Sequence, residues 1–211
     1  MVIKNSKILI VSILWSLVFL FGNYPNHLSI AQESEGEFAP EIESILFQRM
    51  EYLKEEIAKN PLIIRCLEES NEKNRNISLK EIREKDAQWT SLKEYSQEYN
   101  TFVNQRCSNF LKDFQQKKDN DVYVEIFITD LNGLNVAMTN KTTDYYQADE
   151  EWWVKVFSGG KGYSYYGDIE IDESALSHSI SLYLPIKNAE QDALVGVMKV
   201  VLDIVAIKRE L

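Results

Sequence analysis

The spacing of apolar residues changes from a helical period to a strand period near Asp119–Asp121, and this change divides the chain into two halves. Before it, residues 41–60 carry apolar side chains at steps of three and four, which predicts an amphipathic helix with one buried face. After it, residues 122–129 alternate between two faces, which predicts a β-strand. The order of helices, hairpin, short helix and three strands predicts an α+β fold with an antiparallel sheet of about five strands.

Local signals place the boundaries of the helices. Pro61 disfavours helix at the preceding residue and suits the first turn of a new one, so the helix over 41–60 ends there and a short helix follows. Ser78–Glu81 matches a capping box and starts a second long helical region. A break in that region is expected between Thr90 and Ser96, because the periodicity slips.

The second half is predicted to form a hairpin, a short helix and three strands. Asp130–Gly133 is a turn that leads into a return strand over 134–139. Asp149 is the expected N-cap of a helix that runs to Phe157. Strands are expected over residues 163–171, 179–186 and 193–202, the last of them central and covered on both faces, and a terminal helix starts at Asp203.

The N-terminus has the pattern of an export signal. Lys4 and Lys7 precede an apolar run from Ile8 to Phe21, and Ser29–Ala31 offers small residues for cleavage. Fourteen helical residues span about 21 Å, less than the about 30 Å of a bilayer core, so a cleaved signal is favoured over an uncleaved anchor. We expect a signal at 1–31, a linker at 32–40 and one domain at 41–211, with a helical part to 118 and a sheet part from 119.

The net charge limits the kinds of ligand and macromolecule that the chain can bind, and the two cysteines limit its metal sites and disulfides. The chain has 33 acids against 23 bases and a formal net charge of −10, which argues against nucleic acid and anionic membrane surfaces and agrees with a cationic ligand. Cys66 and Cys107 match no metal-binding spacing. They can pair in an oxidising compartment, but a domain of this size does not require the bond, and the sequence leaves the pairing open.

Residues 144–153, DYYQADEEWW, combine four aromatic rings with four carboxylates. Apolar walls with a few charges are typical of a small-molecule site. The alternative is a structural helix whose tryptophans fill the core while its acids face solvent. Only one indole of Trp152 and Trp153 is expected to point inward, because neighbouring helical residues are about 100° apart.

Other clusters of functional groups favour structural explanations. Asp168, Glu170 and Asp172 share one strand face and suit calcium, but a solvated face is the better interpretation. His178 has no nucleophile motif around it. Two acids of residues 144–153 could have the spacing of a glycosidase pair, but the sequence has no other feature of a glycosidase. We therefore expect no enzyme activity, no metal and no cofactor.

The sheet half resembles the Cache, or PDC sensor, family of PAS-like extracytoplasmic sensor domains. The resemblance is carried by residues 125–153, 167–175, 184–186 and 194–204, with support from 77–89, and covers 41–211. It implies a single Cache module with a long N-terminal helix and a pocket between the sheet and the short helices and loops that cover it.

The resemblance also bears on the ligand. Amino-acid-binding members carry a tyrosine, an arginine and an aromatic pair on the segment that matches 144–153. Here Tyr145 falls on the tyrosine, but Glu150 falls on the arginine, so the carboxylate clamp is absent. This favours an amine or another cation, which carboxylates and ring faces hold well.

We therefore expect a non-enzymatic sensing module in the periplasm, secreted or held by its uncleaved signal. The N-terminal helix is expected to support a homodimer or a membrane receptor partner. The alternative is a ligand-free interaction module that binds a membrane partner through that helix. The predicted ligand-binding residues are Asp144, Tyr145, Tyr146, Glu150, Trp152, Trp153, Tyr165 and Asp168.

Overall fold

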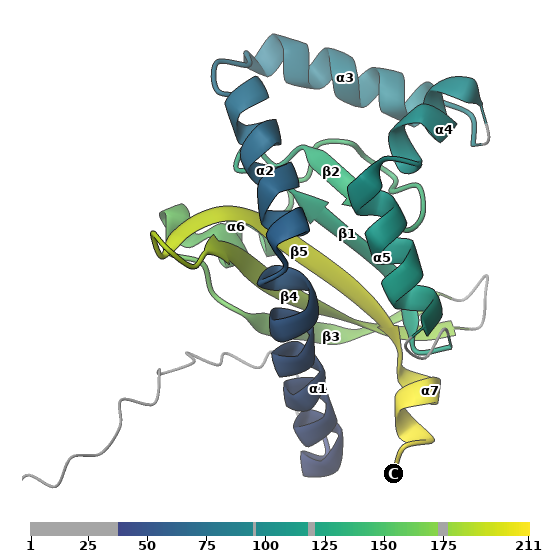
Figure 1. The fold of residues 1–211 in the computed structure, drawn as a ribbon. Coiled ribbons are helices and arrows are strands. Elements are labelled where there is room, and N and C mark those ends of the chain that lie inside the picture. The colour runs from purple at the N-terminus through teal and green to yellow at the C-terminus, as the bar shows by residue number, and fades with distance from the viewer. Residues whose placement is uncertain (1–37, 95, 118–120, 173–176) are drawn as a thin grey trace, which may run out of the picture.

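A five-stranded antiparallel sheet with the order β2-β1-β5-β4-β3 forms the centre of the protein (Figure 1). The computed structural model describes residues 38–94, 96–117, 121–172 and 177–211. The predicted α+β, PAS-like fold is confirmed, and the apolar C-terminal strand is central as expected. The strands are β1 Tyr123–Thr129, β2 Asn135–Met138, β3 Tyr165–Asp172, β4 Ser177–Asn188 and β5 Ala193–Asp203.

Helices precede the sheet and connect its strands. The π-helix η1 continues α1 without a break, so the helix predicted over 41–60 is present with a wider last turn. The helices are α1 Pro40–Leu53, η1 Lys54–Ala58, α2 Pro61–Lys73, α3 Leu79–Ser91, α4 Gln97–Val103, α5 Arg106–Lys117, α6 Glu151–Phe157, η2 Ser158–Gly160 and α7 Ile204–Lys208.

Most of the expected boundaries are confirmed. The Ser78–Glu81 capping box is formed in both directions, and α3 ends at Ser91, within the predicted break. The expected N-cap of α6 was wrong by one residue: the cap is Glu150, and its side chain makes no capping hydrogen bond. Glu150 adopts the extended backbone of a cap because Trp153 and Val154 donate their N–H groups to its carbonyl oxygen.

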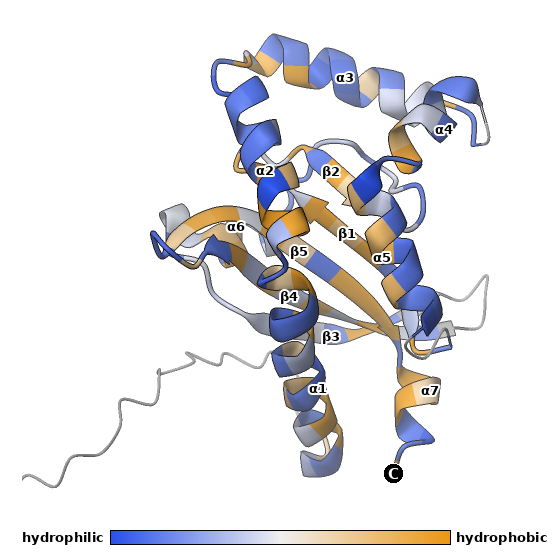
Figure 2. Ribbon diagram, viewed as in Figure 1, coloured by the Kyte–Doolittle hydropathy of each residue, from blue (hydrophilic) through white to orange (hydrophobic). Residues whose placement is uncertain are grey.

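One face of the sheet carries the largest apolar cluster, and α1, α2, α5 and α7 contribute to it (Figure 1). Leu53 of α1, Leu67 of α2 and Leu111 of α5 are fully buried there, together with Ile128 and Met198 of the sheet. Gly196 of β5 allows α2 to approach, because a Cβ at this position would lie 2.7 Å from the Leu67 side chain. Hydrophobic residues run along β1 and β5, whereas hydrophilic residues predominate on α3 (Figure 2).

The turn after β1 is fastened to the end of α2. The fully buried Asp130 carboxylate accepts hydrogen bonds from the backbone N–H of Asn132 and Leu134, at 2.9 and 3.0 Å. It also accepts from Ser70 Oγ and Asn74 Nδ2 on α2, each at 2.8 Å. These four donors satisfy a buried charge and fix the hairpin relative to α2.

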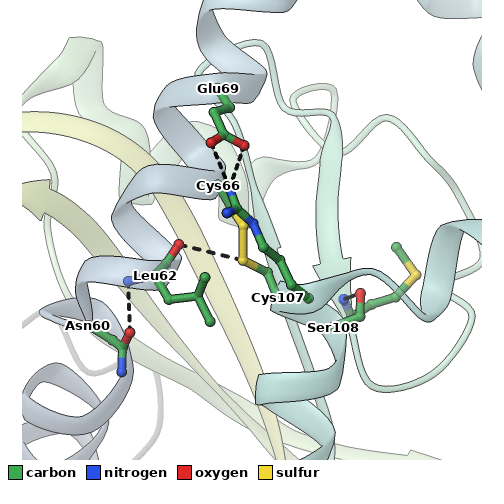
Figure 3. The surroundings of a disulfide bond; sticks show 8 residues. Asn60, Leu62, Cys66, Glu69, Cys107 and Ser108 are labelled. Atoms are coloured by element: carbon green, nitrogen blue, oxygen red, sulfur yellow. Dashed lines mark hydrogen bonds and ion pairs between the residues drawn. A yellow bond between two sulfur atoms is a disulfide. The ribbon is translucent and has the colours of Figure 1, made fainter.

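A disulfide joins Cys66 of α2 to Cys107 of α5, which settles the pairing that the sequence left open (Figure 3). Their Cα atoms are 6.7 Å apart, and one turn along α2 Glu69 accepts from Arg106 at 2.6 Å. The bond closes a segment of chain that contains α3 and α4.

Replacing both cysteines, in Cys66→Ser with Cys107→Ser, is expected to lower the free energy of unfolding by about 3–4 kcal/mol, because a cross-link over 41 residues restricts the unfolded chain. Urea denaturation of the oxidised protein and of the double variant measures the difference. A reducing agent should lower the wild-type midpoint and leave that of the variant unchanged. Equal midpoints in the oxidised state would contradict this role.

Candidate ligand-binding site

The start of the DYYQADEEWW segment runs beside the hairpin and is held there by backbone hydrogen bonds. Asn135 donates its N–H to the carbonyl of Tyr145 at 3.0 Å, and Gln147 donates to Gly133 at 2.8 Å. On the other side, Asp86 of α3 accepts the N–H groups of Tyr145 and Tyr146, at 2.7 and 3.0 Å. The tyrosines are therefore fixed between β2 and α3.

Tyr145 belongs to a group of three aromatic rings that come from distant parts of the chain. Its ring centroid lies 5.8 Å from that of Trp89 on α3 and 5.5 Å from that of Phe102 on α4. Trp89 and Phe102 are 5.2 Å apart, and the Trp89 indole donates to the carbonyl of Thr142 at 2.9 Å. Aromatic pairs at these separations are stabilising beyond the area that they bury.

This aromatic group lines a pocket with a volume of about 670 Å³. The volume lies within the range of about 300–1,000 Å³ that is usual for small-molecule sites. The pocket lies among the end of α2, helices α3 and α4, and the DYYQADEEWW segment. Its charged lining includes Lys73, Lys85 and Lys93 against one acid, Glu98.

A smaller pocket of about 210 Å³ adjoins the large one, since both are lined by Lys73, Lys85, Phe102 and Tyr145. It reaches toward the disulfide and the hairpin, where Cys66, Ser70, Asn74 and Asn135 contribute to its lining. An aromatic wall therefore continues into a polar end.

Burial keeps the Tyr145 phenol protonated. Loss of solvation raises the pKa of Tyr145 to about 12, and the negative charge of Asp130 adds to the effect. The pKa of Tyr146 is also raised, first by burial and then by Asp149, with Arg83 acting in the opposite direction. At neutral pH both hydroxyls can donate a hydrogen bond.

The two tryptophans of the segment contact the opposite face of the sheet from α1. Trp153 is 5% exposed; its indole donates to Thr129 Oγ1 at 2.8 Å and stacks on Phe157. Trp152 is half-buried but also contacts this face, because its ring stacks on Tyr183 of β4 with centroids 5.2 Å apart. As expected, only one of the two indoles, that of Trp153, is fully buried. Both indoles nevertheless contact the sheet, which was not expected.

Lysines of the protein itself lie over the Trp152, Tyr183 and Tyr165 rings on this face of the sheet. Lys199 Nζ lies 5.4 Å from the Trp152 centroid and 5.8 Å from that of Tyr183. Lys155 Nζ lies 4.4 Å from the centroid of Tyr165, whose hydroxyl donates to the carbonyl of Trp152 at 3.1 Å. The sequence analysis missed Lys199, although a single lysine in the apolar run from Leu194 to Leu202 is a visible signal.

The predicted acidic residues do not gather at either pocket. Asp144 is half-buried; its carboxylate accepts from Thr143 at 2.9 Å, and its carbonyl accepts from three neighbouring side chains. Glu150 and Asp168 are exposed, and neither lines the two pockets. Of the eight predicted residues, Tyr145 lines both pockets, and Trp152, Trp153 and Tyr165 lie together on the sheet face.

One acid on this sheet face is unusual. Glu125 of β1 is half-buried, and this burial raises its pKa to about 7, although the positive charge of Lys199 opposes the shift. Glu125 and Lys199 share a face, because Phe127, two residues along β1, pairs with Lys199. Glu125 is therefore partly protonated near neutral pH.

The described residues contain no group of three or more His, Cys, Asp or Glu side chains arranged to hold a metal ion. No helix in the described ranges is long and apolar enough to cross a membrane. The predicted signal at residues 1–31 lies outside these ranges.

Neither a protein-family model nor a curated protein matches this chain. Among solved structures, it is similar to the sensory domain of the Campylobacter jejuni chemoreceptor Tlp3 (CcmL), at 12% identity and a TM-score of 0.39, over 81% of this chain and 67% of that one. It is also similar to the ligand-binding domain of the Pseudomonas aeruginosa PAO1 amino acid chemoreceptor PctC in complex with GABA, at 12% identity and 0.36, over 62% and 53%.

A third similar structure is the extracellular domain described as that of the histidine kinase vpHK1S-Z8, at 15% identity and a TM-score of 0.44, over 79% of this chain and 53% of that one. The chain thus spans about half the length of two of these three structures. They are described as a sensory domain, a ligand-binding domain and an extracellular domain.

The Glu125→Gln variant is expected to change how stability depends on pH. The folded protein keeps the Glu125 proton up to a pKa of about 7, whereas the unfolded chain releases it near 4.5. The wild type therefore loses stability as pH rises through this window, and the variant should lose less, by up to about 1.4 kcal/mol per pH unit. Urea denaturation from pH 4 to pH 8 compares the two, and parallel profiles would contradict the assignment.

Proposed function

We propose that this chain is an extracytoplasmic, non-enzymatic module that binds and senses a small molecule. The observation that carries the proposal is the pocket of about 670 Å³, in which Tyr145 meets Trp89 and Phe102. A concave site with aromatic walls and a few polar groups is the usual form of a small-molecule site. A ligand-free interaction module, the alternative, predicts a pocket filled by its own side chains.

Tyr145 is the predicted site residue that we place in contact with ligand. Trp152 contributes indirectly, since it packs against Phe127 in the same apolar cluster as Trp89. Asp144 and Tyr146 hold the segment in position through hydrogen bonds of their backbone groups. Direct ligand contacts by Glu150, Trp153, Tyr165 and Asp168 stay predictions from the sequence.

The preference for an amine or another cation was inferred from Glu150 and from open ring faces. Glu150 is exposed at the start of α6, and lysines of the chain lie over the Trp152 and Tyr165 rings. The large pocket has more lysines than acids in its lining. We therefore treat the amine as one class to be tested against others.

An extracytoplasmic location and a single domain over 41–211 are part of the proposal. A disulfide between α2 and α5 supports an oxidising compartment, because such bonds persist mainly outside the cytosol. A homodimer through the N-terminal helix, or a membrane receptor partner, would use the sides of α1 that do not face the sheet. Residues such as Glu41 and Gln48 keep part of this helix in solvent.

A thermal-shift screen of the protein against amines, amino acids, carboxylates and purines tests the function. A ligand at 100 times its dissociation constant is expected to add about 2.7 kcal/mol of stability and to raise the melting temperature by several degrees. The Tyr145→Ala variant should lose that shift, since it removes one side of the aromatic wall.

Tyr163→Ala is the matched control, because Tyr163 is 41% exposed and does not line either pocket. It should retain the shift. A ligand whose effect survives Tyr145→Ala binds elsewhere, and the absence of any shift across all four compound classes would sink the sensing proposal and favour the interaction module.

A further inference from the structure

Two lysines converge on the candidate site from different helices. Lys73 is on the last turn of α2 and Lys85 is on α3, yet both line the large pocket, the small pocket and a third pocket of about 390 Å³ at the α2–α3 junction. Both side chains are exposed, and neither forms a hydrogen bond or salt bridge with a described residue. Their charges are available to a bound molecule.

Three acids near these lysines are engaged by other groups, whereas Glu98 also lines the large pocket. Glu69 is bound by Arg106 at 2.6 Å, and Glu72 pairs with Arg75. Glu81 forms the capping box with Ser78, whose hydrogen bonds lower the pKa of this carboxylate, with a smaller contribution from Lys85. The two lysines thus give a local positive potential in a chain of net charge −10.

The polar end of the site contains an unsatisfied acceptor. Asn135 is 2% exposed and lines the small pocket, and its Oδ1 has no hydrogen-bond partner among the described residues. Its amide orientation is fixed, because Nδ2 donates to Thr142 Oγ1 and to the carbonyl of Asp144, each at 2.8 Å. A buried carbonyl oxygen without a donor is costly, so a donor from a bound molecule or from an ordered water is stabilising at this position.

We propose that the site binds an organic anion that has an aromatic or apolar body and a hydrogen-bond donor. The Trp89, Phe102 and Tyr145 rings contact the body, Lys73 and Lys85 bind the anionic group, and Asn135 accepts from the donor. This inference rests on the proposed function and names the ligand class of the same pocket. The proposed ligand is an anion, whereas the sequence favoured an amine or another cation.

A series of compounds that share one ring and differ in charge tests the class: phenylacetate, phenylacetamide and phenethylamine, with 4-hydroxyphenylacetate as the anion that carries a donor. Isothermal titration of the full chain is expected to give phenylacetate an affinity at least tenfold above that of phenethylamine, and 4-hydroxyphenylacetate a higher affinity still. Raising the salt concentration should weaken binding of the anions, because exposed charges are screened.

The double variant Lys73→Gln with Lys85→Gln should lose about tenfold in affinity for phenylacetate and little for phenylacetamide. Lys80→Gln is the matched control: Lys80 is also on α3, lies 3.8 Å from Glu84 and lines none of the three pockets. It should bind phenylacetate as the wild type does.

Tighter binding of the amine, unchanged binding of phenylacetate by the double variant, or no binding by any member of the series would each overturn the anion proposal. These outcomes are distinct from failure of the sensing function, which requires that no compound class in the broad screen binds. An equal affinity of phenylacetate and 4-hydroxyphenylacetate would overturn the role given to Asn135.

Discussion

The buried carboxylate of Asp130 is the interaction on which the arrangement of the site depends. An ionised group with no exposed surface is stable only if hydrogen bonds replace its hydration, and here two backbone N–H groups and two α2 side chains do so. Ser70 and Asn74 thereby hold the end of α2 over the hairpin and also line the small pocket. The same negative charge contributes to the raised pKa of Tyr145. One buried charge thus links the hairpin, α2 and the candidate ligand wall.

The elements of the fold could be predicted from the sequence because they depend on local signals. The capping box at Ser78, the turn at Asp130–Gly133 and the alternation in β1 each involve residues close in the chain. The site required distant contacts: Lys73, Trp89 and Phe102 come from three helices, and no periodicity indicates that they share a pocket with Tyr145. The segment that contains Tyr145 could be chosen from composition, but its neighbours could not.

Net charge was a poor guide to the charge of the site. The chain is strongly acidic, and the DYYQADEEWW segment contains four of its acids, yet these acids face solvent or accept local hydrogen bonds. The charged groups of the large pocket are Lys73 of α2, Lys85 of α3, Lys93 between α3 and α4, and Glu98 of α4, and no sequence pattern marks them as parts of one site. Composition sums charges over the chain, whereas a ligand responds to those within a few ångströms.

The disulfide has a mechanical consequence for α3 and α4. Cys66 and Cys107 stand on either side of the segment that carries Lys85, Trp89 and Phe102, so this segment is a loop whose two ends are tied together. A local opening of this segment therefore leaves Cys66 and Cys107 joined and keeps both of its ends at the contact between α2 and α5.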